Sequence, residues 1–179
     1  KVKALITAAG MGRRFGALTR RKNKCLLEVE GQALITHLLR NLRSAGIRES
    51  WVVTGHEHAA LKKLVQDRAR TVFNPFYTVS GILGSFWAAK PHLDGQAFLF
   101  TTSDHFFRPE VLRDCLRSKK DLCIVVQRKK AYTKEDAKVT IKNLHVTDIG
   151  KGLPVHRADG EFGGMALFSA RASKLFFQE

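Results

Sequence analysis

Short apolar segments of strand type alternate with amphipathic helical segments along the first two thirds of the chain. Residues 3–8 form a strand-like run, and leucine and isoleucine at helical spacing between residues 34 and 42 predict a helix that ends near Gly46. Further strands are expected at 51–54, 71–73, 97–101 and 122–127, and further helices at 59–67, 83–90 and 109–116. This alternation predicts an α/β fold: a mostly parallel sheet with helices on both faces and right-handed crossovers.

The last third of the chain changes to closely spaced strands. Residues 137–141 and 145–149 flank Lys142 and Asn143, which predicts a small β-hairpin insertion, and 162–168 is expected to be a strand before a final helix. No repeat, low-complexity tract or interdomain linker interrupts the 179 residues. We therefore expect a single domain over residues 1–179.

The charge balance restricts the partners. Lys and Arg together number 31 and Asp and Glu 16, a formal net charge of +15 that favours a polyanionic partner: nucleic acid, anionic lipid or a small phosphorylated substrate. No apolar run approaches the roughly 20 residues that span a bilayer, so direct membrane insertion is not expected. The three cysteines, Cys25, Cys115 and Cys123, form no CxxC pair, which favours a reducing, cytoplasmic location over a zinc or disulfide framework.

The loop after the first strand is rich in glycine and arginine. In an open α/β sheet, ligands bind beyond the carboxyl ends of the strands, and glycines there let backbone amides approach phosphate oxygens. A Rossmann fingerprint would need Gly or Ala where Phe15 stands, and a Walker loop would need Gly-Lys-Ser/Thr, which is absent. The segment therefore predicts a phosphate-binding loop of another kind, although a flexible basic surface loop is the simpler alternative.

The segment from Ala8 to Leu34 resembles the nucleotidylyltransferases that activate sugar phosphates and related phospho-alcohols. That family usually has Gly-x-Gly-Thr-Arg-Leu, Leu-Thr, Pro-Lys, Leu-Leu, Val-x-Gly and Pro-Leu; this chain keeps the spacing without a gap. Arg13 replaces the Thr and Asn23 replaces the Pro, while the two key cations, Arg14 and Lys24, are kept. The resemblance implies the fold of nucleotide-diphospho-sugar transferases, and nucleotide binding by the loop residues Ala8, Ala9, Gly10, Met11, Gly12 and Arg13.

A second motif follows the strand expected at 97–101. Ser103-Asp104-His105 is similar to the strand end at which the family's Asp holds the catalytic magnesium, and an Asp carboxylate suits Mg²⁺. Alone, Asp104 would more simply be explained as a cap of the following helix. The resemblance implies that Asp104 is catalytic and a metal ligand, with Mg²⁺ as cofactor, and that Ser103 contacts the nucleotide.

Later segments resemble cytidylyltransferases acting on inositol 1-phosphate, phosphocholine or aminoethylphosphonate. Asn74-Pro75-Phe76-Tyr77 and Ser85-Phe86 match their Asn-Pro-x-Tyr and Ser-Leu segments, although Gly81-Ile82 replaces the usual Asn-Asn. The resemblance implies nucleotide binding by Ser85. It also implies acceptor binding by Lys138, Lys151 and Glu161. For the two lysines, the alternative is that each is a solvated charge at the end of a strand. Family members usually continue past the final helix with a further acidic stretch, so the usual C-terminal end of the family is expected to be missing from residues 1–179.

The resemblance implies transfer of CMP from CTP to a phosphorylated small alcohol or sugar phosphate, with release of pyrophosphate. We assign Arg14 to the leaving pyrophosphate and Lys24 to the charge that develops at the α-phosphate. The base preference stays open, so a UTP- or dTTP-dependent sugar-1-phosphate enzyme is an alternative. A nucleic-acid-binding module or a catalytically silent nucleotide-binding regulator is another, although no RNP-like strand or zinc-finger spacing is present. Similar domains are sometimes joined to a membrane-embedded transferase, which leaves a fused membrane domain open; the oligomeric state is not predicted.

Overall fold

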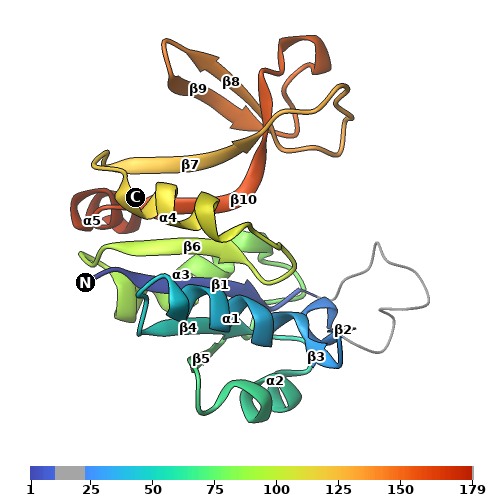
Figure 1. The fold of residues 1–179 in the computed structure, drawn as a ribbon, viewed down its shortest axis with the longest axis vertical. Coiled ribbons are helices and arrows are strands. Elements are labelled where there is room, and N and C mark those ends of the chain that lie inside the picture. The colour runs from blue at the N-terminus through green and yellow to red at the C-terminus, as the bar shows by residue number, and fades with distance from the viewer. Residues whose placement is uncertain (11–22, 179) are drawn as a thin grey trace.

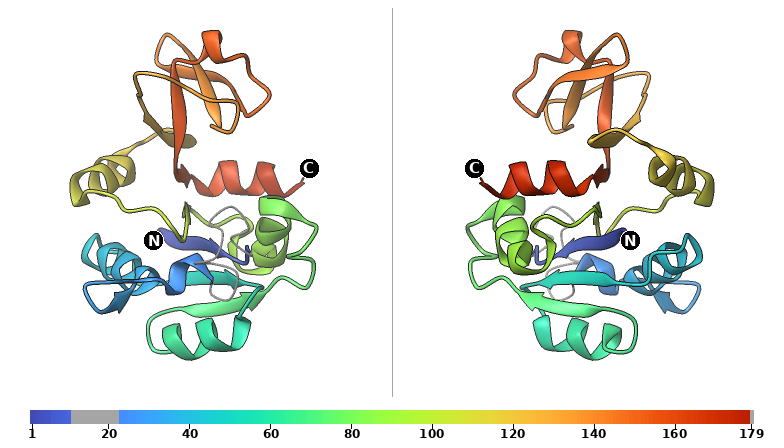
Figure 2. Two further views of the ribbon diagram at one scale, coloured as in Figure 1. Left: turned by 90° about the vertical axis from the view of Figure 1, so that its right-hand side faces the viewer. Right: turned by 90° about the vertical axis from the view of Figure 1, so that its left-hand side faces the viewer.

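The computed structural model describes residues 1–10 and 23–178. Its strands and helices form one large sheet with helices on both sides (Figures 1 and 2). The strands of this sheet are β1 (Lys3–Ala8), β4 (Ser50–Thr54), β5 (Arg70–Phe73), β6 (Phe98–Thr102), β7 (Leu122–Gln127), β8 (Lys138–Lys142), β9 (His145–Gly150) and β10 (Gly160–Phe168). The helices are α1 (Leu34–Ser44), α2 (His58–Val65), α3 (Gly81–Leu93), α4 (Pro109–Arg117) and α5 (Ala170–Gln178). The expected fold class is thereby confirmed.

The sheet order is β5-β4-β1-β6-β10-β8-β9, and β7 also pairs with β10. The four strands β5, β4, β1 and β6 are parallel, whereas β10 runs antiparallel to β6, β7 and β8. All parallel strands therefore end at the same edge, which lies on the right in Figure 1. The predicted hairpin is β8–β9, and it projects from the antiparallel end of the sheet.

Alternation along the strands divides the core between the two faces. In β1, Ala4, Ile6 and Ala8 face a core that includes residues of α1, α2 and α4, while Leu5 faces one that includes residues of α3 and α5. Figure 2 shows α1 and α4 on one side of the sheet and α3 and α5 on the other. Helices thus cover both faces of β1, and its last residue, Ala8, is itself buried.

Local sequence explains several element boundaries. Pro109 begins α4, where its missing N–H costs no hydrogen bond. Glu110 in the first turn and Arg117 in the last turn have the charges that the helix dipole favours at those ends. The structure adds short elements that sequence analysis did not predict. A 3₁₀ helix, η2 (Lys24–Leu26), and a small hairpin of β2 (Glu28–Val29) and β3 (Gln32–Ala33) precede α1. A second 3₁₀ turn, η3 (Val155–Arg157), precedes β10.

Candidate active site

A cavity of about 490 Å³ opens at the carboxyl ends of β1 and β6. Its described lining consists of Thr7, Ala8, Ala9, Gly10, Asn23, Lys24, Tyr77, Thr78, Val79, Gly81, Ile82, Ser85, Thr102, Ser103 and Asp104. Seven residues that the sequence assigned to nucleotide, metal or catalysis are among them: Ala8, Ala9, Gly10, Lys24, Ser85, Ser103 and Asp104. The expected residues Met11, Gly12, Arg13 and Arg14 lie outside the described residues.

Asn23 connects two of the segments that line this cavity through its hydrogen bonds. Its side-chain amide donates to the carbonyl of Ala8 at 2.6 Å, and its Oδ1 accepts from the backbone N–H of Cys25 at 3.3 Å, which caps η2. Its own backbone N–H donates to the carboxylate of Glu57. The residue that replaces the family's usual Pro thus joins the end of β1 to the short helix that carries Lys24.

Lys24 and Asp104 come together although 80 positions separate them in the chain. The Lys24 ammonium lies 3.4 Å from Asp104 Oδ2, and both side chains remain partly exposed to the cavity. Hydrogen bonding from His105 and Thr102, together with the positive charge of Lys24, holds the pKa of Asp104 well below its usual range despite partial burial. Asp104 is therefore an ionised carboxylate beside an open space.

The end of β6 is tied to β1 and to η2 below this pair. The backbone N–H of Ser103 donates to the carbonyl of Thr7 at 3.2 Å, and its side chain contacts the Cys25 thiol. Burial raises the pKa of Cys25 to about 12, so this thiol stays protonated and packs as a small apolar group. Ser103 is itself buried and contributes to the cavity wall.

The opposite wall comes from the segment between β5 and α3. Asn74 is fully buried; its amide donates to Ser80 Oγ at 3.1 Å, and its Oδ1 accepts from the N–H of Phe76 at 2.9 Å. A Cβ at Gly84 would lie 2.1 Å from Ser80 Oγ, so only glycine lets α3 approach this turn. This arrangement places Tyr77 and Ser85 on the cavity wall.

Tyr77 is held against a second glycine. A Cβ at Gly55 would lie 2.5 Å from Tyr77 Cβ and 2.7 Å from the carbonyl oxygen of Ala9. Gly55 follows β4 and has no side chain. The end of β1 and the turn before α3, which form two walls of the cavity, can therefore both pack closely against its backbone.

The residues expected to bind the acceptor have other contacts in the structure. Lys138 is fully buried, and its ammonium donates to the carbonyls of Thr133, Lys134, Asp136 and Lys151, the last at 2.7 Å. These four contacts favour a structural role for Lys138 over phosphate binding, because the ammonium has no path to a ligand without losing them. Burial of this kind could not be read from its place near the start of a strand.

Lys151 and Glu161 lie outside the described cavity lining and are both in ion pairs. Lys151 Nζ lies 3.2 Å from Glu135 Oε2, and both side chains are at least half exposed. Glu161 pairs with Lys129, which also lies 3.4 Å from Asp136. Lys151 is accessible to a ligand, whereas Glu161 contributes to a cluster that joins β10 to the chain after β7.

Asp104 provides the one carboxylate among the described residues that line the cavity. Within residues 1–10 and 23–178, no group of three or more His, Cys, Asp or Glu side chains is placed to hold a metal. Mg²⁺ commonly binds one or two protein carboxylates and completes its shell with phosphate oxygens and water. A single ionised carboxylate at an open cavity therefore fits Mg²⁺ that is shared with a bound triphosphate.

Sequence analysis missed several residues that shape the site. Asn23 was noted only as a departure from the family, and Gly55 was not noted. The pair Asn74 and Tyr77 belonged to a recognised motif, but their roles required the contacts with Ser80 and Gly55. The exchange of Pro for Asn before Lys24 was the available signal, because Asn commonly caps helices through its side chain.

Comparisons with known proteins identify the family and the fold of this chain. The family model of the MobA-like NTP transferase domain matches residues 4–172. The CTP:phosphoglutamine cytidylyltransferase of Campylobacter jejuni is 26% identical over 94% of this chain, and a glucose-1-phosphate thymidylyltransferase of Xanthomonas campestris is 30% identical over 64%. This chain spans 73% of the first relative and 41% of the second.

The fold is also found in a solved structure, that of the inositol-1-phosphate CTP transferase from T. maritima. It superposes with a TM-score of 0.82 at 19% sequence identity, over 99% of this chain and 74% of that chain. In the described part of this chain, no helix is long and apolar enough to cross a membrane.

Proposed function

Because the chain belongs to the MobA-like NTP transferase domain family, we propose that it is a cytidylyltransferase that transfers CMP from CTP to a phosphorylated small alcohol or sugar phosphate and releases pyrophosphate. The observation that carries the proposal is the meeting of Lys24 and Asp104 at the cavity where β1 ends. A cation and an ionised carboxylate at one open edge are the groups that metal-assisted transfer of a nucleotidyl group requires. The free thiols of all three cysteines suit action in the cytoplasm.

The chain's own groups have distinct tasks in this reaction. The backbone at Ala8, Ala9 and Gly10 and the glycine-rich loop bind the triphosphate, while Ser85 and Ser103 line the nucleotide's cavity. Lys24 faces the charge that builds on the α-phosphate while the acceptor's phosphate oxygen bonds to the α-phosphorus and the bond to pyrophosphate breaks. Arg14 neutralises the departing pyrophosphate.

Asp104 is the residue that would hold Mg²⁺. When bound, the ion neutralises phosphate oxygens and so makes the phosphorus accessible to an anionic nucleophile. Asp104 suits this task because its carboxylate is ionised and borders the cavity. The Lys24 contact keeps it oriented toward the same space.

The test combines the protein and Mg²⁺ with each of the four nucleoside triphosphates. The acceptor panel contains inositol 1-phosphate, phosphocholine, aminoethylphosphonate and hexose 1-phosphates, and mass spectrometry identifies the products. Asp104→Asn is the inactive control. Asp67→Asn, at an exposed position beyond α2, is the matched control for loss of an acidic charge.

We expect a CDP-linked product that disappears in Asp104→Asn and persists in Asp67→Asn. A UDP- or dTDP-hexose would favour the sugar-1-phosphate alternative, which the thymidylyltransferase relative supports. Triphosphate binding without product from any pair would favour a silent nucleotide-binding regulator. Absence of triphosphate binding would contradict both the nucleotidylyltransferase function and the role of a silent nucleotide-binding regulator.

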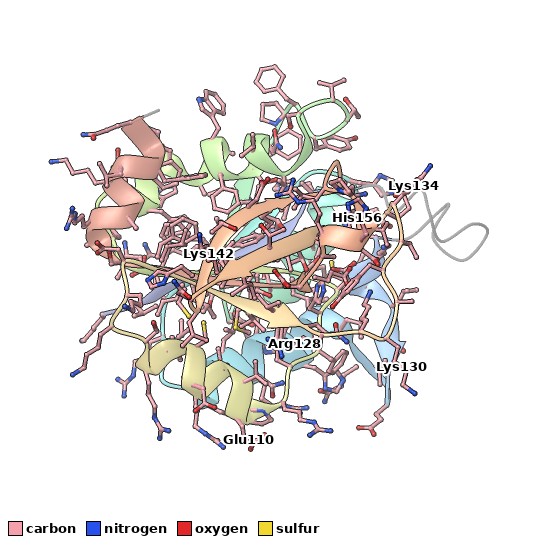
Figure 3. The ribbon with its side chains drawn as sticks, turned by 90° about the horizontal axis from the view of Figure 1, so that it is seen from above. Glu110, Arg128, Lys130, Lys134, Lys142 and His156 are labelled. Carbon is pink, nitrogen blue, oxygen red and sulfur yellow. The ribbon has the colours of Figure 1, made fainter. Side chains whose placement is uncertain are left out.

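The net charge alone does not favour a nucleic-acid partner. Figure 3 shows Arg128, Lys130 and Lys134 along the chain after β7, with Lys142 apart from them on the hairpin, so these cations form no continuous stripe. Nucleic-acid affinity falls steeply with salt because counterions are released. In a salt titration with a random oligonucleotide, we therefore expect any binding at low salt to be non-specific and to be lost as the salt concentration rises.

A further inference from the structure

His105 contacts a residue nearby in the sequence, Phe107, and a distant one, Gly164. Its ring stacks on Phe107, with ring centroids 5.8 Å apart and an interplanar angle of 11°. The ring also lies against the backbone of Gly164, where a Cβ would be 2.6 Å from both Cε1 and Nδ1 of His105. The imidazole thus occupies space that only a glycine in β10 leaves open.

The backbone of β10 is adapted to this contact. Gly164 has a φ of +76° and lies between Phe162 and Ala166, where the pairing of β10 with β7 shifts register. Residues other than glycine rarely adopt this backbone conformation. Glycine is therefore favoured at position 164 for two separate reasons, the backbone angle and the close approach of the His105 ring.

The polar edge of the same ring faces the site. Nδ1 of His105 lies 3.4 Å from Asp104 Oδ1 and contacts Thr102 Oγ1. Lys24 contacts the other oxygen of the same carboxylate. Asp104 therefore has one oxygen held by Lys24 and the other by a ring whose position depends on Gly164.

We propose that His105 is a positioning residue, and that β10, acting through Gly164 and the His105 ring, sets the orientation in which Asp104 binds a divalent cation together with the nucleoside triphosphate. This proposal rests on the proposed function, because that function makes Asp104 the metal-binding carboxylate. Groups that orient metal ligands commonly affect metal affinity or activity 10- to 100-fold.

The experiment uses Mn²⁺, which is visible by electron paramagnetic resonance, as the probe in place of Mg²⁺. Its dissociation constant is measured in the presence of CTP, and kcat and KM for CTP are measured separately by pyrophosphate release. His105→Phe keeps an aromatic ring but removes Nδ1. His105→Asn keeps a donor near the Nδ1 position.

Gly164→Ala tests the contact with β10. Gly95→Ala is its matched control: Gly95 has a φ of +68° but a Cβ there would meet nothing within 4 Å, so it reports the cost of the backbone angle alone. A double variant, Gly164→Ala in a His105→Ala background, tests whether Gly164 acts through the ring.

We expect His105→Phe and Gly164→Ala to weaken Mn²⁺ binding by roughly 10- to 100-fold and to lower kcat, with KM for CTP nearly unchanged at saturating metal. His105→Asn should recover most of the Mn²⁺ affinity, and Gly95→Ala should bind Mn²⁺ as the wild type does. In the His105→Ala background, Gly164→Ala should weaken Mn²⁺ binding little further.

Wild-type Mn²⁺ affinity and turnover in His105→Phe would overturn the proposal. So would a full Gly164→Ala effect in the His105→Ala background, because Gly164 would then act by another route. If the wild type formed no nucleotidyl product while Mn²⁺ binding still depended on His105, the proposed function would fail and the positioning role would stand. A wild-type protein that bound no Mn²⁺ in the presence of CTP would contradict both the proposed function and the positioning role of His105.

Discussion

The site edge, where β1 and β6 end, and the hairpin region, residues 128–161, use the same kinds of charged side chain in different ways. At the site edge, Lys24 and Asp104 pair beside an open cavity. In the hairpin region, Lys138 is buried among backbone carbonyls and Lys129 is shared by Glu161 and Asp136. Figure 1 shows the hairpin region at the start of β10, whereas the site edge lies beside the middle of that strand, where Met165 pairs with Thr101. Position in the fold, rather than residue type, separates charges available to a ligand from charges that stabilise loops.

The physical basis of the difference is what surrounds each ammonium. Four carbonyl oxygens replace water around Lys138, so withdrawing it toward a ligand would leave buried acceptors without a donor. Lys24 instead lines the cavity, and its ammonium lies 3.4 Å from Asp104 Oδ2. The comparison predicts that variants at the site edge change turnover, while variants in the hairpin region change stability.

The largest effect is expected for Lys24→Ala. Loss of one positioned cation should lower kcat at least about a hundredfold, because that cation stabilises charge that develops in the transition state. Steady-state pyrophosphate release measures the effect, with Lys62→Ala, an exposed lysine on α2, as the control. Near-normal turnover in Lys24→Ala would remove this residue from the mechanism and break the contrast between the two regions.

Lys138→Met should act on the free energy of unfolding instead. Methionine keeps most of the volume but leaves buried carbonyls unsatisfied, which should lower stability by about 1–3 kcal/mol. Urea unfolding measures this, and Lys142→Met, at an exposed position on the same strand, should change stability little. KM for CTP should be unchanged in Lys138→Met; a large increase would mean that the hairpin region contributes to nucleotide binding.

The parts of the molecule that sequence could predict are those encoded locally. The alternation of strands and helices gave the fold class, and the motifs around Lys24 and Asp104 were correctly placed at one edge of the sheet. The two-residue strands β2 and β3 were missed because they are too short for a periodic pattern. The contact of His105 with Gly164 could not be predicted, since it depends on how β10 bends beside β6.

Asn23→Ala should have a smaller effect, and it links stability to the site. Removing the cap of η2 and the bond to the Ala8 carbonyl should lower the free energy of unfolding by about 1 kcal/mol. Because η2 carries Lys24, kcat should also fall, which urea unfolding and pyrophosphate release together would detect. Asn41→Ala, on α1 and outside the cavity lining, is the control for loss of an amide side chain. If stability fell without any change in kcat, Asn23 would be a structural residue only.

The smallest effect is expected for Lys151→Ala, which tests whether the hairpin region takes any part in acceptor binding. An exposed ion pair contributes about 0.2–1 kcal/mol, so both Lys151→Ala and Glu135→Ala should change the free energy of unfolding by less than about 1 kcal/mol. If Lys151 binds the acceptor phosphate, its loss should raise the acceptor KM about threefold, the equivalent of one exposed charge contact. Glu135→Ala removes the same ion pair but keeps the ammonium, so its acceptor KM should not rise. An equal acceptor KM in the two variants would mean that Lys151 only stabilises the loops. The acceptor would then be bound wholly by the site edge.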